Sequence, residues 1–304
     1  QAQHDLIIFP ELCLTGYPPE DLLLRPEFYQ RTERAVEQIQ HAVKDCYVII
    51  GYPSALHGVH FNSAALLGDN KRRIYHKQLF PNYGVFDEKR YFAAGKEIFS
   101  FSCKGYHFGL CICEDLWQKG PVEELAKLSI DCLICINASP FDYQKLNQRI
   151  ALLTQRSSLG FPVVYVNLVG GQDELIFDGQ SMVMNQHGII TALAPAFQEA
   201  LETITLEKGE IFGQVTRTLS QEQLIYEALV LGTRDYVEKN RFPGVILGLS
   251  GGIDSALTLA IAVDALGPER VQVLMMPSRY TAGISNEDAQ QQINALGVQG
   301  QFMH

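Results

Sequence analysis

The 304-residue sequence lacks any apolar run of the ~18 residues that a membrane-spanning helix needs. No signal peptide is visible at its start, because Gln1-Ala2-Gln3-His4-Asp5 has neither a basic region nor an apolar stretch. Clusters of Lys and Arg are missing too, and the net charge is −10. Since neutralising phosphates requires clustered cations, the composition argues against a general nucleic-acid binder. We therefore expect a cytoplasmic protein that binds neither membrane nor nucleic acid.

Cysteine is present, but in a pattern that does not predict disulfides. The seven cysteines are an odd number, and a chain of this size without an export signal seldom carries a disulfide framework. The pairs Cys111/Cys113 and Cys132/Cys135 also suggest zinc ligands, which would make the protein a metal-binding scaffold. Both pairs, however, lie in runs typical of central strands, where positions 132 and 135 point to opposite faces. Buried free cysteine is the simpler interpretation.

The length and the apolar pattern predict about two α/β domains. Hydrophobic residues make up 47% of the chain and charged residues 19%, as in a globular protein. We expect a first domain over residues 1–205, a linker over 206–219 and a second domain over 220–304, where Ser220 and Gln223 form a capping box. Strand-like runs of the first domain are 6–9, 47–52, 61–67, 108–112, 132–137 and 163–168.

A Ser-Gly-Gly turn lies between a strand-like run at 245–247 and a helix-like run at 257–266. Two glycines let the backbone approach an anion, and the free amides of a helix start point at it. No Lys follows the second glycine, so this is not a P-loop. The string resembles the pyrophosphate loop of the ATP pyrophosphatase superfamily, whose members cleave ATP between the α and β phosphates to adenylate a substrate. The resemblance implies ATP contacts from Gly248, Leu249, Ser250, Gly251, Gly252, Ile253, Asp254 and Ser255, with Asp254 reaching Mg²⁺ directly or through phosphate.

Three residues of the first domain lie close to the ends of strand-like runs and carry the groups of a nucleophilic site. Glu11 follows Phe9-Pro10, Lys77 lies in a segment beginning at Tyr75, and Cys113 stands where a strand meets a polar turn. A cysteine nucleophile needs a base to form its thiolate and a positive group or donor to hold the developing oxyanion. A buried glutamate can be that base, and a lysine can supply the charge.

Glu11, Lys77 and Cys113, each in its local string, resemble the Glu-Lys-Cys triad of the nitrilase, or carbon-nitrogen hydrolase, superfamily. The resemblance covers residues 1 to about 205 and implies a nitrilase-like αββα sandwich. It implies that Glu11 takes the proton of Cys113, that Cys113 attacks the side-chain amide of glutamine, and that Lys77 steadies the oxyanion. It also implies glutamine-binding roles for Tyr83, Ser139 and Lys145.

Together the two halves resemble the glutamine-dependent NAD synthetase family, also in the strings at 14–22, 170–174, 178–181, 226–229 and 276–280. This resemblance implies that ATP and Mg²⁺ activate deamido-NAD as an adenylate, and that ammonia from the first domain completes NAD, with release of AMP and pyrophosphate. The second domain would then be the start of a Rossmann-like ATP-pyrophosphatase α/β domain. Because the family's pattern extends beyond both residue 1 and residue 304, we expect an incomplete sequence. We also expect a homo-oligomer.

Two other enzymatic interpretations stay open. The first is a stand-alone carbon-nitrogen hydrolase with a nucleotide-sensing domain, against which the Ser-Gly-Gly-x-Asp-Ser string argues. The second is ATP-dependent amidation of another acid, because none of the motif residues named here has a side chain that would specifically recognise the nicotinate group.

Overall fold

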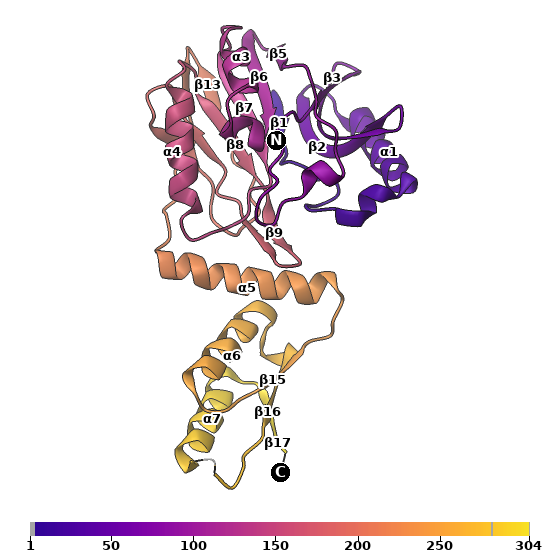
Figure 1. Ribbon diagram of the computed structural model, residues 1–304. Helices are drawn as coiled ribbons and strands as arrows, with labels where there is room; N and C mark the ends of the chain where they lie inside the picture. The colour runs from indigo at the N-terminus through magenta and orange to yellow at the C-terminus, as the bar shows by residue number, and fades with distance from the viewer. Residues whose placement is uncertain (1–3, 281, 304) are drawn as a thin grey trace. The chain divides into compact units, whose positions relative to one another are not determined.

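The computed structural model of the chain describes residues 4–280 and 282–303; residues 1–3, 281 and 304 lie outside the described part (Figure 1). The first three residues of the expected first domain are among them. The chain divides into two compact units. One comprises Gln1–Val169 and Phe177–Thr218, and the other comprises Gly170–Ile176 and Leu219–His304.

The first unit is built on two sheets. The smaller has the strand order β1-β2-β3-β4, and the larger has the order β12-β11-β8-β7-β6-β5. In the larger sheet β6, β7 and β8 run parallel, and their carboxyl ends therefore meet at one edge. The strands of the smaller sheet are β1 (Leu6–Ile8), β2 (Tyr47–Leu56), β3 (Val59–Gly68) and β4 (Lys71–His76). Those of the larger sheet are β5 (Phe99–Cys103), β6 (Tyr106–Ile112), β7 (Cys132–Asn137), β8 (Val163–Asn167), β11 (Met182–Met184) and β12 (Ile190–Leu193).

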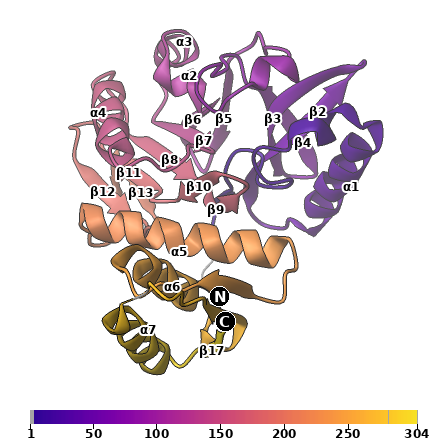
Figure 2. The same ribbon diagram turned by 60° about the horizontal axis from the view of Figure 1, so that its bottom comes forward.

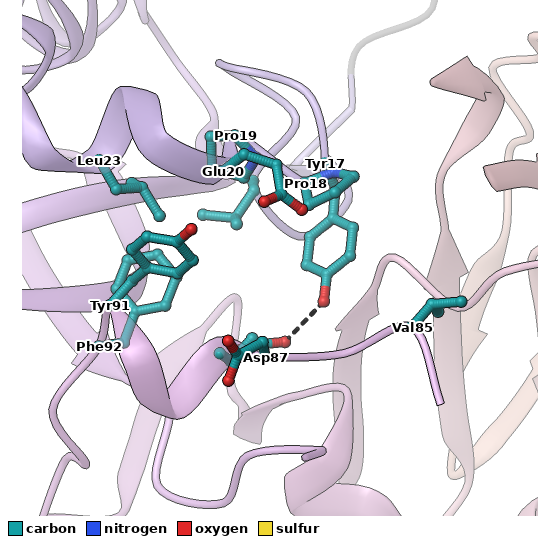
Figure 3. A pocket seen from close by; sticks show the side chains of 11 residues that line it. Tyr17, Pro18, Pro19, Glu20, Leu23, Val85, Asp87, Tyr91 and Phe92 are labelled. Atoms are coloured by element: carbon teal, nitrogen blue, oxygen red, sulfur yellow. Dashed lines mark hydrogen bonds between the residues drawn. The ribbon is translucent and has the colours of Figure 1, made fainter. Parts of the chain in front are cut away.

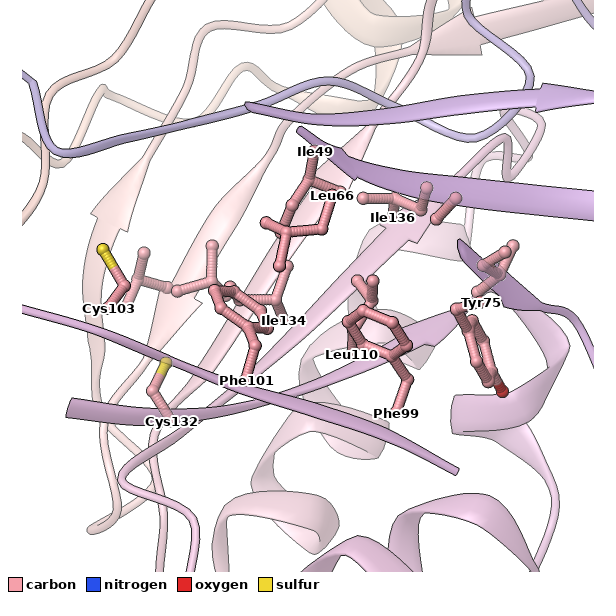
Figure 4. Close-up of a cluster of buried hydrophobic side chains, with 14 of the residues drawn as sticks. Ile49, Leu66, Tyr75, Phe99, Phe101, Cys103, Leu110, Cys132, Ile134 and Ile136 are labelled. Atoms are coloured by element: carbon pink, nitrogen blue, oxygen red, sulfur yellow. The ribbon is translucent and has the colours of Figure 1, made fainter. Parts of the chain in front are cut away.

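Helices cover the outer face of each sheet, which gives four layers. Helix α1 (Pro26–Ala42) buries Val36 against the smaller sheet, and α3 (Pro121–Ala126) and α4 (Lys145–Ser157) cover the larger one. Figure 1 shows α1 and α4 on opposite outer sides of the two sheets. The core between the sheets joins Ile49 and Leu66 of one to Leu110 and Ile134 of the other (Figure 4). The expected αββα sandwich is confirmed, and every residue of the mostly apolar strand β7 is buried, because both faces of the larger sheet are covered.

Residues 206–219, expected as a linker, contain ordered structure. Strands β13 (Thr205–Glu207) and β14 (Glu210–Phe212) form an antiparallel hairpin, and Ile211 is buried in the core between the two sheets. Just after β14, the Gly213 amide donates to the carbonyl of Thr191 in β12 at 3.0 Å. The first unit therefore continues to Thr218, because the hairpin covers apolar surface that the larger sheet would otherwise expose.

The second unit has a parallel sheet of order β15-β16-β17, formed by β15 (Val245–Gly248), β16 (Val271–Met275) and β17 (Gln299–Phe302). Helices α6 (Ile253–Leu266) and α7 (Gly283–Leu296) connect these strands and pack on them (Figures 1 and 2). Helix α5 (Gln221–Lys239) precedes the sheet and packs on α6. Its expected capping box is confirmed, because the Gln223 amide donates to Ser220 Oγ and the Ser220 amide donates to Gln223 Oε1.

The remaining elements are short. Strands β9 (Val169–Gln172) and β10 (Leu175–Asp178) pair as a two-stranded sheet. Helix α2 (Glu114–Trp117) follows β6, and single 3₁₀ turns occur at η1 (Glu20–Leu24), η2 (Glu88–Arg90) and η3 (Pro268–Arg270). Within residues 4–280 and 282–303, no helix is long and apolar enough to cross a membrane.

Candidate active site

Four side chains of the first unit meet where strands of both sheets end. Glu11 follows β1, Lys77 follows β4, Cys113 follows β6, and Glu88 lies in the turn η2. Lys77 and Glu11 are completely buried, and Glu88 and Cys113 are about 5% and 6% exposed, respectively. The Lys77 ammonium donates to Glu11 Oε1 at 2.7 Å and to the two oxygens of Glu88 at 2.8 and 2.9 Å. The structure thus brings together the three predicted residues and adds a second glutamate.

Glu11 is held by donors from other segments. The Ala138 amide, just after β7, donates to Glu11 Oε2 at 2.8 Å, and Asn62 of β3 donates to Oε1 at 2.7 Å. Gly51 of β2 lets the Glu11 segment approach closely, because a Cβ at Gly51 would lie 2.4 Å from the Pro10 carbonyl oxygen and 2.7 Å from the Glu11 Cα. The side chain is therefore fixed by both sheets, and no exposed loop sets its position.

Charge at this site is concentrated and shielded from water. Burial acts to lower the pKa of Lys77, but Glu11 and Glu88 outweigh it and hold that pKa well above its usual value. Burial raises the pKa of Glu88, which Lys77 opposes. All three protons of the Lys77 ammonium have a carboxylate acceptor, so the lysine is a fixed positive charge.

Cys113 occupies an unusual backbone conformation. Its φ is +45° and its ψ is −99°, a region that residues with a Cβ seldom adopt and that stores about 1–3 kcal/mol of strain. A regular strand would put Cys111 and Cys113 on one face, and that expectation is wrong here. Cys111 packs on the helix side of the larger sheet, whereas Cys113 joins Leu110 and Ile112 between the sheets. The turn re-aims the thiol at the buried charges.

The Cys113 thiol is protonated at rest. Burial raises its pKa well above the usual value, and Glu11 adds to this rise while Lys77 opposes it. Because a thiolate is the nucleophilic form, an attack by Cys113 requires a base that removes the proton as the new bond forms. Glu11 is the buried carboxylate whose charge acts most strongly on this thiol.

Beside Cys113 lies a second group of polar side chains that includes two of the predicted glutamine-binding residues. Glu114, the residue after Cys113, is about 4% exposed and accepts a hydrogen bond from the Tyr83 hydroxyl at 3.2 Å. Lys145 begins α4, and its ammonium lies 4.5 Å from the centre of the Trp117 ring. Burial lowers the pKa of Lys145, and the nearby Arg149 acts in the same direction.

Ser139, the third predicted glutamine-binding residue, is held rigidly after β7. Its amide donates to Asn167 Oδ1 at 2.9 Å, and its carbonyl accepts from Arg149 at 2.8 Å. Arg149 is fully buried and forms two hydrogen bonds with Asp178, at 2.8 and 2.9 Å. The Ser139 backbone thereby adjoins Ala138, whose amide holds Glu11.

A pocket opens next to Glu88 on the side of η1 and the η2 turn (Figure 3). The Tyr17 hydroxyl donates to Glu88 Oε1 at 2.9 Å, and the same oxygen accepts from Lys77, so the pocket wall adjoins the buried charges. Apart from Tyr17 and Glu88, the wall is formed by Leu12, Pro18, Pro19, Glu20, Leu23, Val85, Asp87, Tyr91 and Phe92.

The sequence patterns assigned no role to Glu88, Asn62 or Tyr17. These residues contact the site across 11 to 71 positions of sequence. Glu88 carries no distinguishing signal, because it stands in the charged run Asp87-Glu88-Lys89-Arg90. Asn62 lies inside a strand, where nothing in the sequence distinguishes it from a solvated residue.

The cysteine pattern does not form a metal site in the part of the chain that the structure describes. All seven cysteines are free, and no three His, Cys, Asp or Glu side chains among residues 4–280 and 282–303 are placed to hold a metal ion. Cys132 and Cys135 lie on opposite faces of β7, as predicted.

In the second unit, the predicted ATP loop has the expected strand, turn and helix. Strand β15 ends at Gly248, Gly252 is the N-cap of α6, and Asp254 is in the first turn of that helix. The Ser250 and Ser255 hydroxyls lie 3.0 Å apart and close the turn. Gly251 has φ +80°, and a Cβ there would lie 2.1 Å from the Ser285 carbonyl oxygen, so glycine is required. Helix-start amides and one carboxylate are groups that suit phosphate and Mg²⁺, respectively.

A two-sheet sandwich with a buried Glu-Lys-Cys constellation at the strand ends defines a cysteine-dependent hydrolase-type unit. Comparison with known families agrees with this class: the model described as carbon-nitrogen hydrolase matches residues 1–211. The chain belongs to the carbon-nitrogen hydrolase family. A second model, described as NAD synthase, matches residues 225–304.

Individual relatives match both parts. The chain is 45% identical over 300 residues to a protein named glutamine-dependent NAD(+) synthetase from Acinetobacter baylyi, covering 97% of this chain and 55% of the relative. A solved structure described as glutamine-dependent NAD+ synthetase from Acinetobacter baumannii with ADP is 47% identical, with a TM-score of 0.95, covering 98% of this chain and 58% of that one. A carbon-nitrogen hydrolase structure from Helicobacter pylori shares the fold alone, at 22% identity and a TM-score of 0.55 over 64% of this chain and 75% of that one. The chain spans about half the length of the curated relatives it matches.

Proposed function

We propose that the protein is a glutamine-dependent NAD synthetase, a carbon-nitrogen ligase that hydrolyses glutamine and uses the ammonia to amidate deamido-NAD at the expense of ATP. The observation that carries the proposal is the joint presence, in one chain, of the buried Glu11–Lys77–Cys113 group and the Ser-Gly-Gly-x-Asp-Ser loop. The relatives that match over both units carry this name.

In the first unit, Cys113 would attack the side-chain amide carbon of glutamine while Glu11 takes the thiol proton. A carbon–sulfur bond forms, and the carbonyl π bond becomes an oxyanion beside the fixed charge of Lys77. Glu11 then returns the proton to the amide nitrogen, the carbon–nitrogen bond breaks, and ammonia leaves. Water, deprotonated by Glu11, hydrolyses the thioester and releases glutamate and the free thiol. The backbone amide of Glu114 is a further candidate donor to the oxyanion.

The polar side chains beside Cys113 fit a free amino acid. Glutamine carries an ammonium and a carboxylate on its α-carbon. Glu114 is an acidic residue that could pair with the ammonium, and Lys145 is a basic residue that could pair with the carboxylate. We propose that Glu114 faces the ammonium, that Lys145 faces the carboxylate, and that Tyr83 and Ser139 complete the pocket. Burial lowers the pKa of Lys145, and the charge of Glu114 opposes that lowering.

In the second unit, residues Gly248 to Ser255 would hold the phosphates of ATP. Asp254 would hold Mg²⁺, directly or through phosphate, and the bound metal would neutralise phosphate charge during adenylation of deamido-NAD. The loop residues themselves contribute helix-start amides and two hydroxyls, at Ser250 and Ser255. Ammonia then displaces AMP from the adenylate to give the carboxamide of NAD.

Incubating the full-length protein with glutamine, ATP, Mg²⁺ and deamido-NAD tests this proposal. We expect NAD, AMP, pyrophosphate and glutamate in equal amounts. Glutamate without AMP would favour the stand-alone hydrolase with a nucleotide-sensing domain. AMP formed only with a different acid would favour amidation of another substrate. The homo-oligomer and the cytoplasmic location stay predictions, which light scattering and cell fractionation can test.

A further inference from the structure

Asp115 links the two chain segments that carry Lys77 and Cys113. Its carboxylate is completely buried and accepts hydrogen bonds from four donors. Oδ1 accepts from the amides of Gln78 and Leu79 at 3.0 and 2.8 Å. Oδ2 accepts from the Tyr75 hydroxyl at 2.7 Å and from the Ile112 amide at 3.1 Å.

The four donors flank the catalytic candidates on both sides. Gln78 and Leu79 directly follow Lys77, and Ile112 directly precedes Cys113. One carboxylate therefore ties the end of β4, in the smaller sheet, to the end of β6, in the larger sheet. All four donors are neutral, so the carboxylate does not belong to an ion pair, and burial raises its pKa to about 6. Burying a carboxylate costs free energy, which hydrogen bonds must offset. Here the hydrogen bonds that offset it also hold the two catalytic segments together.

We propose that Asp115 is a positioning residue that fixes Lys77 relative to Cys113, so that the lysine charge meets the oxyanion formed by attack of the thiol. The inference rests on the proposed glutaminase function. Asp115 is two residues from Cys113 but bonds its own turn only through Ile112, and its other three donors belong to the β4 segment. It therefore acts through those segments and not on the substrate.

Asp115→Asn separates positioning from bulk packing, because the amide has nearly the same size. Its oxygen can keep the Gln78 and Leu79 amides, and its NH₂ can donate to the Tyr75 hydroxyl. The Ile112 amide then faces a donor, so the bond on the Cys113 side is lost. A misplacement of about 1 Å in an active site can cost about 100-fold in rate. We expect kcat for glutamine hydrolysis to fall about 10- to 100-fold with KM changed less than about threefold, since the oxyanion exists only in the transition state.

The experiment compares the full-length wild type, Asp115→Asn and the control Asp131→Asn. Asp131 accepts the His107 amide at 2.6 Å at the other end of β6, and it contacts neither catalytic segment. Three quantities are measured: kcat and KM for glutamine, the melting temperature, and the rate at which iodoacetamide alkylates Cys113, followed on its peptide. We expect only Asp115→Asn to slow both turnover and alkylation, at a melting temperature that keeps the enzyme folded in the assay.

A normal kcat in folded Asp115→Asn, or a raised KM at normal kcat, would overturn the proposal. If Asp115→Asn does not fold, Tyr75→Phe decides, because it removes one of the four donors and leaves the others: a lower kcat at unchanged KM supports the proposal, and an unchanged kcat contradicts it. If wild type does not hydrolyse glutamine, the proposed function fails by itself. The alkylation rates then still report whether Asp115 positions the groups that activate Cys113.

Discussion

Replacing Lys77 by Met removes the one cation between two buried carboxylates while nearly keeping the side-chain length. Lys77 Nζ lies 2.7 Å from Glu11 and 2.8 Å from Glu88, and all three side chains are buried. Removing one partner of a buried ion pair costs about 3–5 kcal/mol, because the remaining charge stays desolvated. With a urea m-value of about 3 kcal/mol/M, that loss lowers the unfolding midpoint of the first unit by about 1–2 M.

The loss of stability in Lys77→Met should depend on pH, and the titration of Glu88 sets the direction of that dependence. Burial already raises the pKa of Glu88 in the folded protein, and Lys77 opposes that rise. Without Lys77 the folded-state pKa rises further, whereas in the unfolded chain it stays near the usual value of about 4.3. An acid with a raised folded-state pKa loses stability as the pH rises from its unfolded pKa through its folded pKa. The variant should therefore be less destabilised, relative to wild type, at pH 5 than at pH 8.

Urea unfolding of the full-length protein, followed by circular dichroism at both pH values, measures these differences. Lys89→Met is the matched control, since Lys89 is an exposed lysine in the same turn as Glu88, and its loss should change stability by less than about 0.5 kcal/mol. A change below about 1 kcal/mol for Lys77→Met, or an equal change at pH 5 and pH 8, would refute the account of the buried charges. Glutamine hydrolysis should fall about 100- to 1,000-fold, as when a donor to an oxyanion is removed.

Three further predictions concern separate parts of the chain. Cys113→Ala should abolish glutamine-driven NAD formation and leave ammonia-driven formation largely intact, whereas Cys111→Ala should keep much of the glutaminase activity; loss of the ammonia-driven reaction in Cys113→Ala would make Cys113 structural. Asp254→Asn should stop AMP release while glutamine hydrolysis survives in part and the melting curve is unchanged; normal AMP release would remove Asp254 from the site. Glu114→Gln should raise KM for glutamine about tenfold or more, because a charged hydrogen bond of about 1.5–3 kcal/mol is lost. Hydrolysis of a simple amide, which has no α-ammonium, should change little. Equal effects on both substrates in initial-rate assays would contradict the proposed contact with the α-ammonium.

The resemblance of short local strings to a known family was sufficient to predict the αββα sandwich and the meeting of Glu11, Lys77 and Cys113, whereas the hydrophobic pattern alone predicted only an α/β domain. Each of these residues stands in a short string beside a strand end, and strand ends of two packed sheets converge. The capping box at Ser220 was equally readable, because both partners lie within three positions of each other. A motif whose partners lie close together in sequence can be recognised without knowing the fold.

Other features depend on contacts that no local pattern records. Glu88 and Asp115 bond groups 11 to 71 and 3 to 40 positions away, respectively, so their roles appear only once the two sheets are packed. The opposite facing of Cys111 and Cys113 depends on a positive φ at Cys113, which strand periodicity cannot foresee. The hairpin of β13 and β14 lies within the region expected as a linker, and its strands of three residues each are too short to show a hydrophobic period.

Trapping the covalent intermediate tests the central claim most directly. The full-length protein is mixed with glutamine, quenched in acid during turnover and digested, and the cysteine-containing peptides are weighed by mass spectrometry. The account predicts a γ-glutamyl thioester on Cys113, absent from Cys111 and from the Cys113→Ala variant. Glutamate release without any adduct on Cys113, or an adduct on another residue, would contradict the assignment of Cys113 as the nucleophile.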